Sequence, residues 1–327
     1  MIVRVFFHDK CFDGACSAAL FSRVYHERIR PSAEFQFSGL LHRAGALFNE
    51  ADFTGDENAI VDFKYSPSPA IKWWFDHHES AFLTPEDAAH FEQQQSNTKF
   101  YDPDFKSCTK LIATVAETRF GFNVEPVSEL VRWADIVDGA TYDSPETAVG
   151  LREPAMKITM VIEATQEPGF VPKLIPLLAN MPLAEIVEHP LVKEKISPLL
   201  ERHQRSIEIL RKHTECIDGT LFFDITQYDL EGYNKFVPYY LHPESIYSVG
   251  LSKSTFRVKI SVGSNPWTSA KDMRNLAKIC ERYGGGGHAR VGAISFPPGQ
   301  WETGRKAAAE IVEELRAYSR KHHQSLI

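Results

Sequence analysis

Short β-rich runs alternate with helical patterns through the first half of the chain, and this alternation most limits the fold that the chain can adopt. The runs are IVRVFF, AEFQFSG, ENAIVDF and IKWWF, and segments such as DGACSAALFSRVYHERI and SCTKLIATVAETRF carry apolar residues at helical spacing. Strands that alternate with helices are typical of a parallel sheet with helices on both faces. We therefore predict an α/β fold that begins with a mostly parallel sheet and flanking helices.

The rest of the chain contains two regions with different patterns. Residues 151–215 lack strand-like runs and end in the amphipathic segment KISPLLERHQRSIEILRKHTE. Strand-like runs return with TLFFDITQ, SIYSVGLS and FRVKISVG, and GRKAAAEIVEELRAYSRK predicts a closing helix. We predict a first domain at residues 1–190, a helical connector at 191–216 and a smaller C-terminal α/β domain at 217–327.

Composition excludes several classes of protein. The 327 residues are 43% hydrophobic, which is enough for two domains with cores of their own. The net charge of −7, without a Lys/Arg run, disfavours indiscriminate binding to nucleic acid. The five cysteines form no CxxC pair, and there is no apolar run of the ~18 residues that a membrane span needs. We expect a soluble cytoplasmic protein with no membrane partner, and a homodimer is one alternative for its oligomeric state.

Metal-binding residue types follow the predicted strands of the first domain. His8 and Asp13 follow the first run, Asp62 closes ENAIVDF, and a further group, Asp76, His77 and His78, follows IKWWF. Each residue alone is more typical of a turn or a helix cap than of a ligand. Together they meet at the carboxyl edge of a parallel sheet, where buried carboxylates and imidazoles need a cation. This mixture of ligands suits Mn, Fe, Co or Zn better than Mg.

The motifs HDKCFDG, IVDF, FDHH and WADIVDG occur in the order seen in the DHH phosphoesterase superfamily, which the chain resembles. The later YGGGGHARVGA is similar to the motif of the DHHA1 accessory domain in that superfamily. The motifs together span nearly the whole chain. The resemblance implies a catalytic domain at 1–190, a substrate-binding domain at 217–327, and an active site in the cleft between them.

The resemblance also implies a role for each residue of the metal-binding group. It implies two metals, usually Mn²⁺, of which His8 binds one and Asp62 bridges both. The second metal would take Asp13, His77 and Asp135, with Asp138 as the alternative to Asp135. His78 would contact the scissile phosphate, and Asp76 would orient a histidine.

The chain departs from the superfamily pattern at Cys11, which stands where the first motif normally has an aspartate. Cys11 as a thiolate ligand would favour Zn²⁺ or Fe²⁺. Asp9 would be a substitute ligand, or the first site would be weak or completed by water. A buried, inert cysteine is the structural alternative.

The glycine run in the C-terminal domain has both a structural and a functional interpretation. A helix end followed by a loop is the structural one. The resemblance implies a substrate-binding segment, made of Gly285, Gly286, Gly287, His288 and Arg290. Glycine allows close approach of a backbone to a phosphate, and a guanidinium suits a terminal phosphate or a base edge. Lys253 is an alternative cation for this role.

These features predict a metal-dependent phosphoesterase that hydrolyses short nucleotides. The superfamily includes RecJ-like exonucleases, enzymes that degrade small RNA or hydrolyse pAp, cyclic dinucleotide phosphodiesterases, and pyrophosphatases and polyphosphatases. No GxSxG motif for a side-chain nucleophile is present. A metal-activated water would then be the nucleophile. Two alternatives remain: an inorganic pyrophosphatase or polyphosphatase, and a non-catalytic nucleotide-binding protein with an incomplete metal site.

Overall fold

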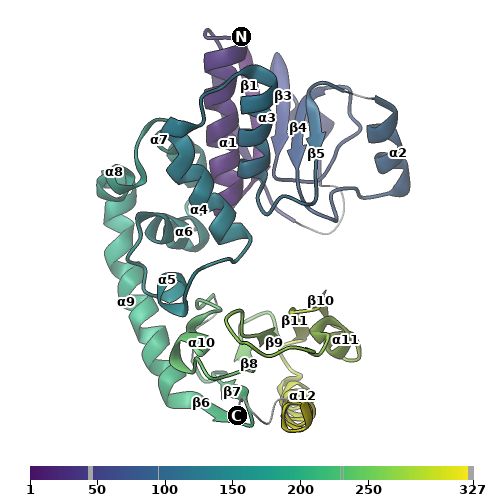
Figure 1. Ribbon diagram of the computed structural model, residues 1–327, viewed down its shortest axis with the longest axis vertical. Coiled ribbons are helices and arrows are strands. Elements are labelled where there is room, and N and C mark those ends of the chain that lie inside the picture. The colour runs from purple at the N-terminus through teal and green to yellow at the C-terminus, as the bar shows by residue number, and fades with distance from the viewer. Residues whose placement is uncertain (43–46, 95, 229, 231, 323–327) are drawn as a thin grey trace. The chain divides into compact units, whose positions relative to one another are not determined.

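The computed structural model describes residues 1–42, 47–94, 96–228, 230 and 232–322 (Figure 1). The chain forms two compact units. Unit 1 comprises Met1–Tyr142 and Leu151–Leu199, and unit 2 comprises Asp143–Gly150 and the chain from Leu200 onward. The helix α9 (Pro190–His213) contains the last crossover between the units, and α5 (Pro145–Val149) lies in the short segment assigned to unit 2.

Unit 1 is built on a five-stranded sheet in which every pair of neighbouring strands is parallel. The strand order is β2-β1-β3-β4-β5. The strands are β1 (Ile2–His8), β2 (Glu34–Leu40), β3 (Glu57–Val61), β4 (Ile71–Asp76) and β5 (Lys99–Tyr101). The predicted mostly parallel sheet is therefore confirmed. Its first four strands coincide with the four β-rich runs, and the short strand β5 was not predicted from the sequence.

Helices cover one face of this sheet. The central helix α1 (Phe12–Val24) is buried along almost its whole length, and its small residues Ala15, Ala18 and Ala19 allow neighbouring helices to pack closely. Figure 1 shows α1 and α3 (Cys108–Phe120) on one side of the sheet. Unit 1 also contains the helices α4 (Ser128–Asp138), α6 (Pro154–Ala164), α7 (Phe170–Asn180) and α8 (Leu183–Glu188). A π-helical turn lies at Tyr25–Ile29, and 3₁₀ turns lie at Glu50–Asp52 and Glu125–Val127.

Aromatic side chains from strands, loops and one helix pack on the opposite face. Phe6, Phe63, Tyr65 and Trp74 form a buried cluster there, and Phe91 of α2 (Pro85–Gln94) packs against it. The Trp74 indole N–H donates to the carbonyl of Phe63 at 2.9 Å. Burial on both faces explains why the strands are continuous apolar runs rather than alternating ones.

Unit 2 contains a mixed sheet of six strands in the order β10-β11-β9-β8-β7-β6, with β7 and β8 parallel and the other pairs antiparallel. The strands are β6 (Thr214–Ile217), β7 (Thr220–Asp224), β8 (Tyr247–Lys253), β9 (Val258–Ser264), β10 (Gly286–His288) and β11 (Val291–Phe296). The predicted C-terminal α/β domain is confirmed.

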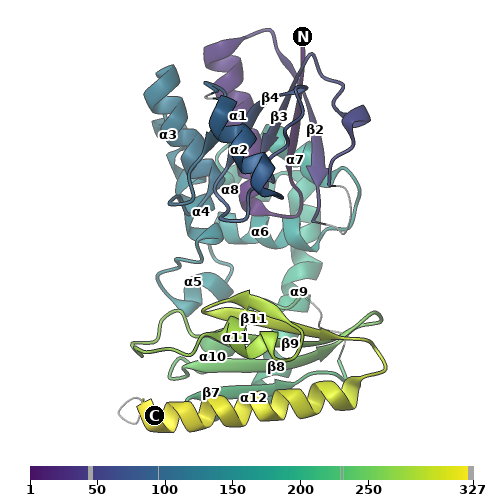
Figure 2. The same ribbon diagram turned by 90° about the vertical axis from the view of Figure 1, so that its right-hand side faces the viewer.

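Two helices pack on one face of this second sheet and a third on the other. The long helix α12 (Trp301–His322) runs along the sheet in Figure 2. It buries Ile311 and Leu315 in the core of unit 2. The helix α11 (Leu276–Glu281) contributes Ile279 to the same core. On the other face, the hydroxyl of Tyr239 in α10 (Val237–Leu241) lies 2.7 Å from the hydroxyl of Ser248. No helix among the described residues is long and apolar enough to cross a bilayer.

Candidate metal centre

The candidate metal centre lies at the carboxyl ends of three neighbouring strands in unit 1. His8 is the last residue of β1, Asp62 follows β3, and His77 and His78 follow β4. Since β1, β3 and β4 are adjacent and parallel, these strand ends meet at one edge of the sheet.

Asp62 is at the centre of the group. Its side chain is 1% exposed, and its backbone has a positive φ of 56°, in the left-handed region that aspartate tolerates better than most residues. One carboxylate oxygen lies 3.5 Å from His8 Nδ1 and the other lies 3.5 Å from His77 Nε2. Neither oxygen has a hydrogen-bond partner, which is rare for buried carboxylates unless a cation is bound.

His77 directs a ring nitrogen at three carboxylates. Its Nδ1 lies 3.0 Å from the carbonyl of Phe105, which can only accept a hydrogen bond, so Nδ1 is the donor. The other nitrogen, Nε2, lies 3.3 Å from Asp138 and 3.8 Å from Asp13, besides Asp62. A neutral ring with its proton on Nδ1 would present the Nε2 lone pair to a metal.

Asp13 is fixed in place by the start of α3. One carboxylate oxygen accepts the N–H of Cys108 at 2.7 Å, and the other accepts the N–H of Thr109 at 3.0 Å. These N–H groups have no partner within the helix, and the positive end of the helix dipole favours a carboxylate there. Asp13 therefore also caps α3, a role that the sequence analysis missed.

The electrostatics of the group describe a site that holds a proton when no metal is present. Burial disfavours a charged imidazole, but Asp138, Asp62 and Asp13 outweigh it and raise the pKa of His77 to about 11. Burial and the charges of Asp62 and Asp138 raise the pKa of Asp13. Burial also opposes ionisation of Asp62, yet His77 and His8 keep the pKa of this carboxyl below its usual value. A divalent cation at this position would replace the proton.

Asp76 positions His78. One Asp76 oxygen accepts hydrogen bonds from the Nδ1 of His78 at 2.7 Å and from the N–H of His77 at 2.8 Å. Burial lowers the pKa of His78, but the contact with Asp76 outweighs it and raises this pKa. Because Nδ1 faces Asp76 and the His78 side chain is 35% exposed, Nε2 is the nitrogen left to meet a ligand.

Cys11, rather than Asp9, lies beside the first metal ligands. Its sulfur is within 4.8 Å of ligand atoms of His8 and Asp62. Burial and the neighbouring carboxylates, Asp62 first, raise the pKa of this thiol well above its usual value. The carboxylate of Asp9 instead packs against Gly39 of β2.

The structure brings His8, Asp13, Asp62 and His77 together and adds Asp138 from the end of α4. Asp138 is 25% exposed. Asp135, one turn earlier on α4, accepts a hydrogen bond from the hydroxyl of Ser107 at 3.2 Å, and that hydroxyl also caps α3. Among the described residues, Asp135 is in none of the groups that could hold a metal.

His42 is a neighbour of the site that the sequence analysis missed. Its ring meets the ring of His8 edge-on at 4.9 Å and stacks on Phe63 at 4.7 Å. His42 follows the end of β2 by two residues, so the rule that found the other strand-end residues would also have found it.

The predicted substrate-binding segment lies in unit 2. The glycine run first ends α11, because Gly284 has a positive φ of 75° and the N–H of Gly285 donates to the carbonyl of Cys280 at 2.9 Å. Gly286 and Gly287 then enter the edge strand β10 rather than a loop. A Cβ atom on Gly285 would lie 2.2 Å from the carbonyl oxygen of Ala293, so the close approach of β11 requires glycine there. A Cβ atom on Gly286 would meet nothing within 4 Å. His288 is exposed, and the Arg290 guanidinium donates to the carbonyl of Asn265 at 3.2 Å.

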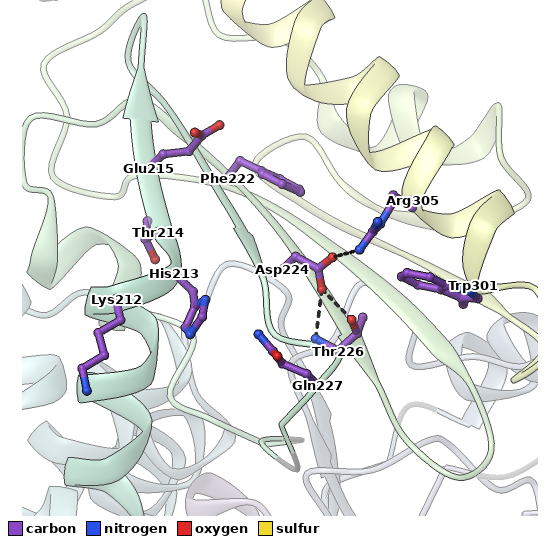
Figure 3. Close-up of a pocket in the computed structure, with 10 residues that line it drawn as sticks. All are labelled: Lys212, His213, Thr214, Glu215, Phe222, Asp224, Thr226, Gln227, Trp301 and Arg305. Carbon is purple, nitrogen blue, oxygen red and sulfur yellow. Dashed lines mark hydrogen bonds and ion pairs between the residues drawn. The ribbon is translucent and has the colours of Figure 1, made fainter.

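Unit 2 also has an open pocket of about 680 Å³ beside β6 and β7 (Figure 3). Asp224 lies on one wall, where it accepts hydrogen bonds from Thr226 and Arg305. None of the residues predicted for catalysis, metal binding or substrate binding lines it. The lining residues are Lys212, His213, Thr214, Glu215, Phe222, Asp224, Thr226, Gln227, Trp301 and Arg305.

Comparisons with known proteins bear on the fold. No protein-family model and no curated protein sequence matches the chain. Among solved structures, the pGpG-specific phosphodiesterase PggH from Vibrio cholerae superposes with a TM-score of 0.68 and 17% identity, over 96% of this chain and 100% of PggH. RecJ from Thermus thermophilus in complex with Mn²⁺ superposes with a TM-score of 0.54 and 14% identity, over 98% of this chain and 52% of RecJ. The chain has the fold of the DHH phosphoesterases.

Residues 75–78, FDHH, lie at the end of β4 in this fold. The donor set fits divalent cations, because the unpartnered buried atoms Asp62 Oδ1 and Oδ2, His8 Nδ1 and His77 Nε2 converge on one place. The predicted cleft between the two domains stays a prediction, as do the predicted domain boundaries.

Proposed function

We propose that this chain is a metal-dependent phosphodiesterase that hydrolyses short nucleotides. The observation that carries the proposal is the Asp62 carboxylate, buried without a hydrogen-bond partner between His8 and His77. Such a group needs a cation. The likeness to a pGpG-specific phosphodiesterase over that enzyme's full length supports the nucleotide substrate.

Two metals would share Asp62. The first would take His8, Asp62 and the sulfur of Cys11, and the second would take the group Asp13, Asp62, His77 and Asp138. Mn²⁺ is the metal we expect, with Zn²⁺ or Fe²⁺ as the alternatives that a Cys11 thiolate would favour. A bound divalent pair would lower the pKa of a water molecule and stabilise negative charge on the phosphate.

The chain's own residues would orient the reaction. The contact with Phe105 keeps the proton of neutral His77 on Nδ1 and leaves Nε2 for the metal. Asp76 holds His78 through Nδ1, so His78 Nε2 would donate to a phosphoryl oxygen. We assign no side-chain nucleophile, since the thiol of Cys11 lies among carboxylates that disfavour its thiolate.

Linear dinucleotides are the substrate class that we favour. The chain matches all of PggH but only about half of RecJ, and its net charge of −7 suits a short ligand better than a long strand. We propose that Gly286, His288 and Arg290 of unit 2 bind the nucleoside or terminal phosphate. Gly286 would allow close approach, and Arg290 would supply positive charge.

A substrate panel tests the proposal. Metal-stripped protein would be assayed with Mn²⁺, Zn²⁺ or Mg²⁺ on pGpG, pApA, pAp, a cyclic dinucleotide and pyrophosphate. We expect the linear dinucleotides to be cleaved fastest with Mn²⁺. Asp62→Asn should abolish turnover, whereas Asp52→Asn, a matched change at an exposed carboxylate, should not.

Three outcomes would contradict the proposal. Preference for pyrophosphate would identify a pyrophosphatase instead. Nucleotide binding without turnover under any metal would identify a nucleotide-binding protein with an incomplete site. Full activity of Asp62→Asn would refute the assignment of the metal ligands.

A further inference from the structure

A second group of metal-binding side chains lies in unit 2, separate from the centre described above. It consists of Cys216, His242 and Glu244, whose ligand atoms all lie within 4.8 Å of one another. Cys216 is in β6, and His242 directly follows α10. Neither the predicted catalytic group nor the substrate-binding segment includes any of the three.

The register of the sheet explains how residues from separate segments meet. Cys216 pairs with Leu221 of β7, and Leu221 pairs with Ser248 of β8, so their side chains lie on one face. Ser248 contacts Tyr239 of α10 on that face. Cys216 therefore points toward the face on which α10 lies, and the chain leaving α10 carries the other two ligands.

The segment that carries His242 and Glu244 is held rigidly. The backbone N–H of His242 donates to Pro238 at 3.0 Å, and its carbonyl accepts the hydroxyl of Ser245 at 2.7 Å. The buried side chain of Asn265 donates to the carbonyls of Pro243 and Ser245, at 3.1 and 2.8 Å. Pro243 has a fixed φ and restricts the backbone of His242 before it.

The same segment is tied to the strand that carries the cysteine. The N–H of Ile246 donates to the carbonyl of Gly219 at 2.7 Å, in the turn that joins β6 to β7. The three ligands are thus held on two segments that are hydrogen-bonded to each other within a few residues of each ligand. A site of this kind loses little conformational entropy when a metal binds.

The three side chains offer one sulfur, one nitrogen and one oxygen. His242 Nδ1 lies 3.1 Å from a carboxylate oxygen of Glu244, so these two ligand atoms are already close enough to contact the same ion. Burial, followed by the charge of Glu244, raises the pKa of the Cys216 thiol to about 11, so a bound metal would have to displace the thiol proton. The Glu244 side chain is 58% exposed, which leaves the group open to ions from solution.

We propose that Cys216, His242 and Glu244 bind a Zn²⁺ ion, with water as the fourth ligand. Thiolate, imidazole and carboxylate are the three ligand types of Zn²⁺, and three protein ligands plus water is a recurrent tetrahedral arrangement. The ion would join the edge strand β6 to the segment that follows α10. This proposal does not rest on the proposed phosphodiesterase function, because all three ligands lie in unit 2.

Cobalt titration of the full-length, metal-stripped protein tests the proposal. Co²⁺ replaces Zn²⁺ and gives a thiolate-to-cobalt charge-transfer band in the near ultraviolet. Because Cys11 would also give such a band, the test uses the Cys11→Ser background. In that background we expect the band to persist, to disappear in Cys216→Ser, and to be unchanged in Cys280→Ser, a control at a buried cysteine of unit 2 outside the group.

Zinc affinity and zinc content in two other variants give a readout that does not depend on whether Cys216→Ser folds. Glu244→Gln changes an exposed side chain, and its affinity for Zn²⁺ should fall at least about tenfold, since even outer contacts of a metal site contribute that much. Mass spectrometry should count one zinc fewer per chain in His242→Gln than in the wild type. Equal zinc content and equal affinity in these variants and the wild type would overturn the proposal.

Discussion

The metal centre in unit 1 should release protons when it binds metal. The pKa of His77 is raised to about 11, so His77 carries a proton between pH 7 and 9 in the metal-free protein. A metal bound to Nε2 must displace that proton. Each unit of pH then changes the free energy of displacement by about 1.4 kcal/mol, and the apparent dissociation constant of the metal should fall about tenfold per unit rise in pH.

Cys11 decides whether a further proton is released. The pKa of its thiol is also raised, by burial and then by Asp62, so a Cys11 thiolate ligand would add one proton and steepen the dependence to about a hundredfold per pH unit. Calorimetric titration of Mn²⁺ in buffers of different ionisation enthalpy counts these protons. A Cys216→Ser background removes the contribution of the group in unit 2.

The expected count is at least two protons for the site as a whole, one from His77 and one from Cys11, and one proton fewer in Cys11→Ser. Cys16→Ser is the matched control, because Cys16 is buried on α1 and belongs to no ligand group among the described residues. Metal binding that releases no proton at pH 7–8 would refute the assignment of His77 as a ligand. An unchanged count in Cys11→Ser would show that Cys11 does not bind as a thiolate.

Three further predictions follow from the contacts. Asp138→Asn should weaken Mn²⁺ binding at least about tenfold, whereas Asp135→Asn, one turn away, should leave the calorimetric affinity unchanged. Asp76→Asn should lower kcat by about 10- to 100-fold with little change in KM, because the charge-assisted hydrogen bond to His78 contributes roughly 1.5–3 kcal/mol. The same change should lower the pKa of the His78 imidazole in NMR titrations. Gly285→Ala should reduce the free energy of unfolding in urea by about 1–3 kcal/mol, whereas Gly286→Ala should keep that stability and raise KM for dinucleotides.

Strand ends were the part of the site that the sequence could predict. Continuous apolar runs that stop at a polar residue indicate that His8, Asp62 and His77 lie at strand ends. Parallel pairing of the strands brings these ends to one edge of the sheet. No measured distance was needed for this step. It depends only on the local pattern and on the topology that alternating strands and helices impose.

Contacts between distant segments were the part that it could not predict. Asp135 and Asp138 are three residues apart on one face of α4, so periodicity alone cannot say which meets His77. The cap that Asp13 provides for α3 joins residues 95 positions apart. Gly286 and Gly287 enter β10 because β11 lies beside them, and glycine's weak strand propensity does not indicate such pairing.

The distribution of unsatisfied groups connects the stability of unit 1 with its chemistry. In the described part of the chain, five of the twelve buried side-chain atoms without a partner belong to His8, Asp62, Asp76 and His77. Each such atom costs about 1–3 kcal/mol when no ion balances it, and the proton that His77 carries in the metal-free protein offsets part of this cost for His77 and Asp62. The buried helix α1 and the aromatic cluster around Trp74 offset this cost, because they provide apolar burial on both faces of the sheet. A cation that coordinates these atoms removes this destabilisation, and the free energy released in this way adds to the free energy of metal binding.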